Sequence, residues 1–301
     1  MRSPWAGGTA RGAEGRGGGE GDAGGEENGD GGDGGGAETT LMEGARSKVE
    51  IFPTRAEVWK AAADRFVTAS GEAIRARGRF TVALSGGESP SGLYKLLASA
   101  PYVYQVDWRF VQICWGDERC VPPDDPESNF RMAREALLDH VPVPAENIHR
   151  IRGEDDPVTA AEACERELRE LFSANPSTKA AAESGARTFD LVLLGLGEEG
   201  HAASLFPAGA AINEARRWVV AERVAKLGRW RVTLTPTCIN AAAEILFLVL
   251  GREKAAILRR VLKDSPRPSL LPAQAIAARF GRLTWLVDAE AGAGISTAGQ
   301  G

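Results

Sequence analysis

From Val49 onward the sequence alternates short apolar runs with longer amphipathic stretches, and this alternation limits the possible folds more than any other feature. Each apolar run ends in Gly or Asp, which is typical of buried strands; the runs span residues 79–87, 108–117, 189–197, 244–251 and 283–288. The stretches with helical spacing span residues 56–74, 91–99, 128–141, 159–173 and 252–262. Strands that alternate with helices predict a three-layer α/β/α sandwich with a mainly parallel, Rossmann-like sheet.

Residues 1–46 have a different composition, dominated by glycine and acidic residues, with almost no apolar side chain to bury. We expect this segment to be disordered, because it cannot offset the entropy lost on ordering. Its glycines lack the flanking strand and helix of a phosphate-binding loop. Residues 47–301 are then predicted to form a single domain, and Met42 lies just before it as a conceivable later start.

The overall charge restricts the partners that the chain can have. The formal net charge is -5 and the sequence contains no run of Lys and Arg, which disfavours nucleic acid as a partner. An acidic small substrate would therefore need a local basic pocket. The four cysteines show no CxxC spacing, so we expect reduced thiols. Neither a membrane span nor a signal peptide is evident, which favours a cytoplasmic protein.

The stretch LSGGESPSGLYKLL, residues 84–97, has the pattern of a strand, a turn and a helix start. Ser89 is a suitable N-cap and Pro90 suits the first helical position. Gly86 and Gly87 let the backbone approach a ligand, and a helix N-terminus offers free N–H groups to an anion. The same pattern also fits an ordinary tight turn.

The stretch WGDERCVPPDDPESN, residues 115–129, places Asp117, Glu118 and Arg119 directly after a predicted strand. Glu118 and Arg119 point to opposite sides of an extended chain, so we expect them to have different partners. A guanidinium at a strand end suits bidentate binding of phosphate or carboxylate. A surface ion pair between neighbours is the alternative.

Residues 194–207, LGLGEEGHAASLFP, place His201 after a predicted strand, among glycines and beside Glu198 and Glu199. A neutral imidazole can take a proton from water, and an adjacent carboxylate can orient it. A hydrogen-bonded core histidine would give the same local pattern. In parallel sheets ligands collect at the carboxyl ends of strands, which is where this segment and the two preceding ones fall.

Lys226, Arg229 and Arg231 lie within six residues of one another and are either solvated surface charges or part of a basic pocket. With Arg119 they would supply the cations that an anionic substrate needs.

Together these motifs resemble the 6-phosphogluconolactonase family. The resemblance rests on SGGESP, WGDERCVPPDDPESN, LGLGEEGHAASLFP, RVTLTP, LPAQAI and LTWLVD, in this order over about residues 47–290. It implies the fold that this family shares with glucosamine-6-phosphate deaminase. A deaminase typically continues after its histidine with a GFNEP-like segment, whereas this chain has ASLFP, which favours the lactonase. The family usually has Asp where this chain has Glu199, whose longer side chain must reach an imidazole or a water with a different geometry.

The resemblance implies hydrolysis of 6-phospho-D-glucono-1,5-lactone in the oxidative pentose phosphate pathway, without metal or organic cofactor. His201 would be the general base and Glu199 would orient it. The substrate-binding residues would be Ser85, Gly86, Gly87, Asp117, Arg119, Asn129, Lys226 and Arg231, with Arg119, Lys226 and Arg231 on the phosphate. The partner would be the sugar phosphate lactone, bound by a monomer or weak homo-oligomer. An isomerase-deaminase and a non-catalytic sugar-phosphate sensor are the alternatives.

Overall fold

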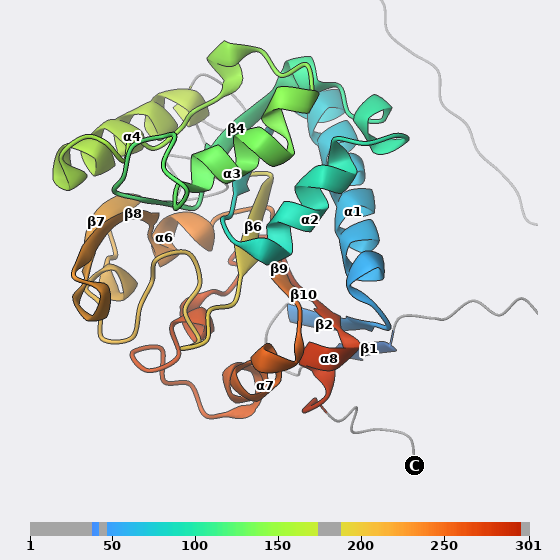
Figure 1. The fold of residues 1–301 in the computed structure, drawn as a ribbon, viewed down its shortest axis with the longest axis vertical. Helices are drawn as coiled ribbons and strands as arrows, with labels where there is room; N and C mark the ends of the chain where they lie inside the picture. Colours follow the sequence, from blue (N-terminus) through green and yellow to red (C-terminus); the bar gives the residue numbers. More distant parts are fainter. Residues whose placement is uncertain (1–37, 42–46, 174–187, 296–301) are drawn as a thin grey trace, which may run out of the picture. The chain divides into compact units, whose positions relative to one another are not determined.

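The structure, a computed structural model, describes residues 38–41, 47–173 and 188–295 (Figure 1). The chain divides into the units Met1–Gly35 and Gly36–Gly301, and every described residue belongs to the second. Most of the segment predicted to be disordered lies outside the described residues. Its residues Glu38–Leu41 differ from that prediction, because they form strand β1, which pairs antiparallel with β2.

The main sheet has seven strands in the order β1-β2-β10-β9-β6-β3-β4, and every neighbouring pair after β1-β2 is parallel. The mainly parallel α/β fold is therefore confirmed. The strands after β1 are β2 (Ser47–Phe52), β3 (Phe80–Leu84), β4 (Val111–Trp115), β6 (Leu191–Gly195), β9 (Glu244–Val249) and β10 (Arg282–Asp288).

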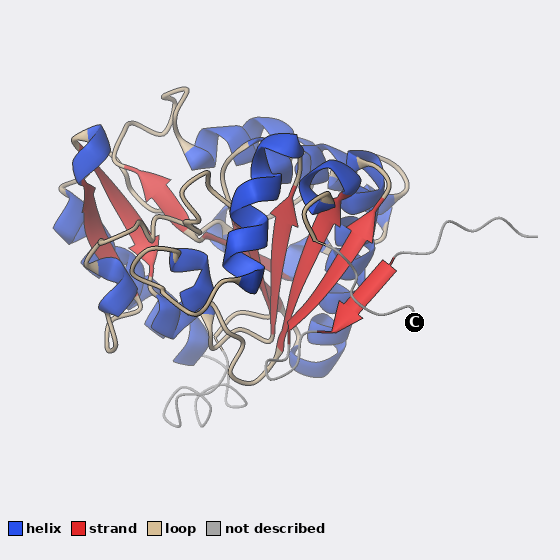
Figure 2. Cartoon of the chain, turned by 90° about the horizontal axis from the view of Figure 1, so that it is seen from below, coloured by secondary structure: helices blue, strands red, loops and turns tan. Residues whose placement is uncertain are grey.

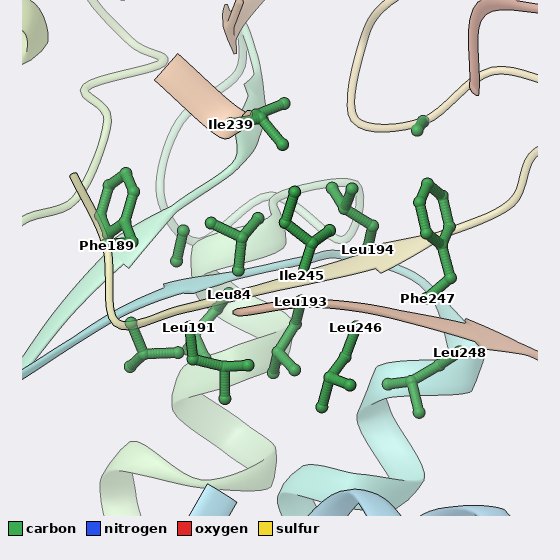
Figure 3. Packing of buried hydrophobic residues seen from close by; sticks show 14 of the residues in the cluster. Leu84, Phe189, Leu191, Leu193, Leu194, Ile239, Ile245, Leu246, Phe247 and Leu248 are labelled. Atoms are coloured by element: carbon green, nitrogen blue, oxygen red, sulfur yellow. The ribbon is translucent and has the colours of Figure 1, made fainter. Parts of the chain in front are cut away.

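The strands at the centre of this sheet are buried on both faces, as expected for continuous apolar runs. All six residues of β9 are buried, and so are all five of β3. Figure 3 shows Ile245 and Phe247 of β9 on one side of the sheet, toward Ile239, while Leu246 and Leu248 project from the opposite side. Each strand of the centre thus contributes to two hydrophobic layers.

The helices cover both faces of the sheet. Helix α1 packs against β3, β9 and β10, and α2 packs against α1 and β6, whereas Ile239 of α6 lies over the other face (Figures 1 and 3). Thr54 begins α1 with a capping box, because its hydroxyl accepts from the N–H of Glu57 and the Glu57 carboxylate accepts from the N–H of Thr54. The α-helices are α1 (Arg55–Arg77), α2 (Glu88–Leu97), α3 (Asn129–Ala136), α4 (Pro157–Ser173), α6 (Pro236–Ile239), α7 (Ala255–Lys263) and α8 (Ala289–Gly292). None of the helices in the described part of the chain is long and apolar enough to cross a membrane.

A second, antiparallel sheet has the order β5-β8-β7 and was not predicted (Figure 2). It consists of β5 (Asp117–Arg119), β8 (Arg229–Leu234) and β7 (Val219–Val224), and α4 packs against β7 and β8. Because β5 follows β4 after Gly116 alone, this small sheet begins where the carboxyl ends of the parallel strands lie.

The strand order places a switch point between β3 and β6. The chain leaves β3 toward β4 on one side and later returns to β6 on the other side. A crevice is expected outside the carboxyl ends of two strands whose connections diverge in this way.

Candidate active site

A cleft of about 640 Å³ opens at this switch point. Its walls come from the turn after β3, from β5, from the loop after β6 and from the segment after β9. The predicted site residues in its lining are Ser85, Gly86, Gly87, Asp117, Arg119, Asn129 and His201. The other three predicted site residues are not among the described residues that line the cleft: Glu199, Lys226 and Arg231.

The turn after β3 presents the N-terminus of α2 to the cleft. Helix α2 begins at Glu88, so the prediction of Ser89 as N-cap is wrong by two residues. Gly87 is the N-cap with φ of 99°, a backbone conformation that favours glycine, and no side chain caps the helix. Pro90 lies within the first turn, where its missing N–H costs nothing. The uncapped N–H groups of this turn are free to bind an anion.

Two buried contacts fix this turn. The Tyr94 hydroxyl accepts from the N–H of Ser85 (2.9 Å) and donates to the Ser85 carbonyl (2.8 Å). A Cβ atom on Gly86 would lie 1.7 Å from Oδ1 of Asn129, so only glycine leaves room for that amide. The Asn129 amide in turn donates to the carbonyl and to Oδ1 of Asp117, at 2.9 and 3.2 Å. The turn and β5 are therefore held in one network.

Glu118 and Arg119 have different partners, as predicted. The buried Glu118 carboxylate accepts from the N–H groups of Arg119, Asn129 and Phe130, at 2.7–2.8 Å, and so binds the N-terminus of α3. Burial raises the pKa of Glu118 even though these hydrogen bonds act to lower it. Arg119 is directed to the cleft side, where its guanidinium donates to the carbonyl of Glu127.

His201 is held against the backbone of its own loop. A Cβ on Gly197 would lie 2.0–2.3 Å from three imidazole atoms, so the ring packs directly on this glycine. The other flank of the ring contacts Phe206, with 4.4 Å between ring centroids. Nδ1 is buried without a hydrogen-bond partner among the described residues, which leaves Nε2 as the nitrogen that can face the cleft.

The surroundings of His201 favour its uncharged form. Burial lowers its pKa below the ordinary value of 6.5, and the positive charges of Lys254 and Arg119 act in the same direction. The negative charges of Asp117 and Glu199 oppose this shift without reversing it. At neutral pH the imidazole is therefore available to accept a proton.

Glu199 binds a different residue from the one expected. Its carboxylate accepts from Nζ of Lys226 at 2.5 Å, and this bond lowers the pKa of Glu199. Lys226 lies in a one-turn 3-10 helix, and its side chain is 74 % exposed. In the described structure these two predicted site residues thus pair with each other, outside the cleft.

Arg119 and Arg231 are cross-strand partners in the small sheet. Arg231 is only 8 % exposed, and no carboxylate of the described residues lies within ion-pair distance of it. Burial and the neighbouring Arg119 lower the pKa of Arg231. Two adjacent guanidinium groups, neither of them in an ion pair among the described residues, form a locus where an anion would be stabilised.

Three further cations line the cleft that were not predicted: Lys254, Arg55 and Lys95. Lys254 lies a few residues after β9, as Arg119 lies a few residues after β4. Its position after an apolar run was therefore a sequence signal that could have predicted it as a site residue. Lys254 and the uncapped end of α2 both line the cleft, and each offers a positive partner to an anion there. No group of His, Cys, Asp and Glu in the described part of the chain is arranged to hold a metal ion.

Comparison with known proteins places this geometry in a family. Residues 53–285 match the family described as glucosamine-6-phosphate isomerases/6-phosphogluconolactonase. The chain is 38 % identical over 252 residues to a 6-phosphogluconolactonase of Nostoc sp., covering 83 % of this chain and 99 % of the relative. The solved structure of 6-phosphogluconolactonase from Trypanosoma cruzi is 28 % identical, with a TM-score of 0.70, over 82 % of this chain and 96 % of that one. A monomeric glucosamine-6-phosphate deaminase, 19 % identical, shares the fold with a TM-score of 0.68 over 82 % of this chain and 99 % of its own. The chain therefore belongs to the glucosamine-6-phosphate isomerase/6-phosphogluconolactonase family.

Proposed function

We propose that this protein hydrolyses 6-phospho-D-glucono-1,5-lactone to 6-phospho-D-gluconate, the lactonase step of the oxidative pentose phosphate pathway. The observation that carries the proposal is an uncharged histidine at a cleft with two cationic loci, in a chain 38 % identical to a named lactonase over nearly that protein's whole length. An ester hydrolase needs a base for water, and a phosphorylated substrate needs cations.

The reaction would begin with attack of water on the lactone carbonyl carbon. Nε2 of His201 accepts one proton of the water while the new C–O bond forms, and the carbonyl electrons move to the oxygen. The intermediate then collapses, the bond to the ring oxygen breaks, and the imidazolium returns its proton to that leaving oxygen. The products are the open-chain hydroxyl and a carboxylic acid, which releases its proton to solvent.

The developing oxyanion would be stabilised by the turn after β3. Gly86, Gly87 and the first turn of α2 line the cleft, and no side chain caps the helix, so their N–H groups would be the donors. Tyr94 and Asn129 hold this turn by buried hydrogen bonds or contacts, so its donors are fixed before the substrate binds. Such preorganised donors stabilise charge in the transition state more than in the ground state.

The phosphate would be bound by Arg119, with Arg231 behind it and Lys226 as the third predicted cation. To reach the phosphate, Lys226 must first leave its ion pair with Glu199. The reverse orientation would place the phosphate at Lys254 and the α2 N-terminus. To separate these orientations, Arg119→Ala and Lys254→Ala are each measured on the phosphorylated lactone and on plain glucono-1,5-lactone. The variant that loses efficiency only on the phosphorylated substrate identifies the phosphate locus.

The activity itself is tested by offering the lactone and glucosamine 6-phosphate side by side, with the spontaneous hydrolysis of the lactone subtracted. Turnover of the lactone alone, abolished in His201→Ala, supports the proposal. Deamination of the amino sugar would favour the isomerase-deaminase that shares the fold. Binding of sugar phosphates without turnover of either compound would favour a sensor. The cytoplasmic location and the monomeric or weakly oligomeric state stay predictions.

A further inference from the structure

Ser204 connects the histidine loop to the small sheet. It lies three residues after His201 and is almost fully buried, so it does not contact substrate. Its hydroxyl donates to Oδ2 of Asp117 on β5 at 2.6 Å, and its N–H donates to Oγ1 of Thr233 on β8 at 3.2 Å. Asp117 and Thr233 face each other across β5 and β8. One serine is therefore bound to two strands that are far from it in sequence.

The chain between His201 and Ser204 contains a residue in a strained backbone conformation. Ala203, in the cleft lining, has φ of 49°, which is unfavourable for a residue with a Cβ. Residues in such conformations persist only where surrounding contacts fix them. Before this turn, the carbonyl of His201 accepts from the N–H of Gly197 at 2.8 Å. The N–H of Leu205 donates to the carbonyl of Ala202 at 3.0 Å and closes the turn, and the two hydrogen bonds of Ser204 anchor it to β5 and β8.

The other partner in this contact, Asp117, is a buried carboxylate with no ion pair among the described residues. Its side-chain donors in the described structure are the Ser204 hydroxyl and the Asn129 amide, of which the hydroxyl is the closer, at 2.6 against 3.2 Å. Four charged groups act on His201: Asp117 and Arg119 from β5, Glu199 from its own loop and Lys254 from the segment after β9. Asp117 and His201 both line the cleft, and of these groups Asp117 does most to favour the charged form of the imidazole.

From this geometry we propose that Ser204 is a positioning residue for the reaction, whose hydroxyl holds the Asp117 carboxylate toward His201 and fixes the loop that presents the imidazole. The proposal rests on the proposed function for its kinetic consequence. The link from Ser204 through Asp117 to His201 is a property of the folded protein and can be measured without substrate.

The test compares Ser204→Ala with Ser128→Ala. Ser128 is an equally buried serine whose hydroxyl donates to the buried carboxylate of Glu118, the neighbour of Asp117, at 3.0 Å. Both variants therefore lose a buried hydrogen bond to a carboxylate on β5, but only one of these carboxylates acts on His201. Each variant is measured for thermal stability, for kcat and KM on the lactone, and for the His201 titration by NMR, with His201→Ala identifying the signal.

We expect Ser204→Ala to lower kcat about tenfold, the rate equivalent of one hydrogen bond to a charged group, with KM nearly unchanged. The titration midpoint of His201 should fall further, because Asp117 is no longer held toward the ring. Ser204→Cys, which keeps the size but donates weakly, should lie between wild type and Ser204→Ala, and it is the variant to use if Ser204→Ala does not fold. Ser128→Ala should lose stability with neither change.

An unchanged His201 titration in folded Ser204→Ala, together with a kcat no lower than that of Ser128→Ala, would overturn the proposal and leave Ser204 a structural residue. If wild type proves not to be a lactonase, the proposed function fails but the titration still decides the link. A shift in Ser204→Ala without a shift in Ser128→Ala would uphold it.

Discussion

Replacing Gly197 by alanine tests whether the exact place of the imidazole matters. The added Cβ would lie 2.0 Å from Cε1 of His201. Since non-bonded carbon atoms approach to about 3.5 Å, the ring must move by roughly 1.5 Å or the backbone must shift to the same extent. A misplacement of about 1 Å in a catalytic group can cost about 100-fold in rate, so we expect kcat to fall by about this factor, or about 2.7 kcal/mol in activation free energy.

The assay is lactone hydrolysis at saturating substrate, followed beside thermal unfolding of each variant. Gly116→Ala is the matched control, because a Cβ there meets only the Leu84 carbonyl at an ordinary 3.5 Å and Gly116 is outside the cleft lining. We expect Gly116→Ala to retain its kcat. A folded Gly197→Ala protein with wild-type kcat would refute the reasoning that the ring must stay packed on this glycine.

Four further outcomes are expected. His201→Ala should lower the lactonase rate by roughly 100-fold or more while the protein stays folded, and near-normal hydrolysis would exclude His201 as the base. Because the base acts when deprotonated and burial lowers its pKa, kcat/KM should be constant across neutral pH and should decrease only when the pH is lowered below 6.5. A decrease that already begins above pH 7 as the pH is lowered would contradict this. Arg119→Ala should lower kcat/KM on the phosphorylated lactone by the equivalent of about 2 kcal/mol and leave kcat/KM on the plain lactone unchanged. Arg119→Lys should restore only part of the loss, because an ammonium cannot form the bidentate fork. Equal losses on both substrates would remove Arg119 from the phosphate site. A chain that starts at Met42 lacks β1, so its melting temperature should fall by about 2–4 °C, the equivalent of about 1 kcal/mol, whereas one that starts at Gly36 should match the full chain.

The effect expected for the chain that starts at Met42 differs from the effect that the sequence alone predicts. Composition predicts that residues before Met42 contribute nothing, because they offer no apolar surface. Strand β1 instead pairs through its backbone with β2, in the register Glu38↔Ile51 to Leu41↔Lys48. Backbone pairing does not require apolar side chains, so a composition argument could not detect this strand.

The parallel sheet was predictable because its central strands are uninterrupted apolar runs, as in β9 and β3. The small sheet was not, since β5 has only three residues, all charged, and β8 begins with exposed Arg229 and Trp230. Its existence depends on pairing between segments more than 100 residues apart, with Arg119 opposite Arg231. Local pattern carries no information about such a register.

Within the site, the sequence predicted which segments come together, but not which side chains in them contact each other. His201 and the glycine turn were found because strand ends are where ligands bind. Glu199 was assigned to His201 because it is adjacent in sequence, yet its carboxylate is paired with Lys226. Ser204 lay within the same motif and was overlooked, because its role depends on a hydrogen bond to Asp117, 87 positions away.

The strand order also has a consequence for how the protein is synthesised. Strands β10, β9 and β6 separate β2 from β3 in the sheet, yet all three follow them in the chain. When β2, β3 and β4 have left the ribosome, the middle of the sheet does not yet exist, and only β3 and β4 can pair as parallel neighbours. Strand β2 therefore stays apart from β3 and β4 until its parallel neighbour β10, Arg282–Asp288, has been translated. We expect chains that stop before β10 to be bound by chaperones or degraded rather than to accumulate as partly folded enzyme.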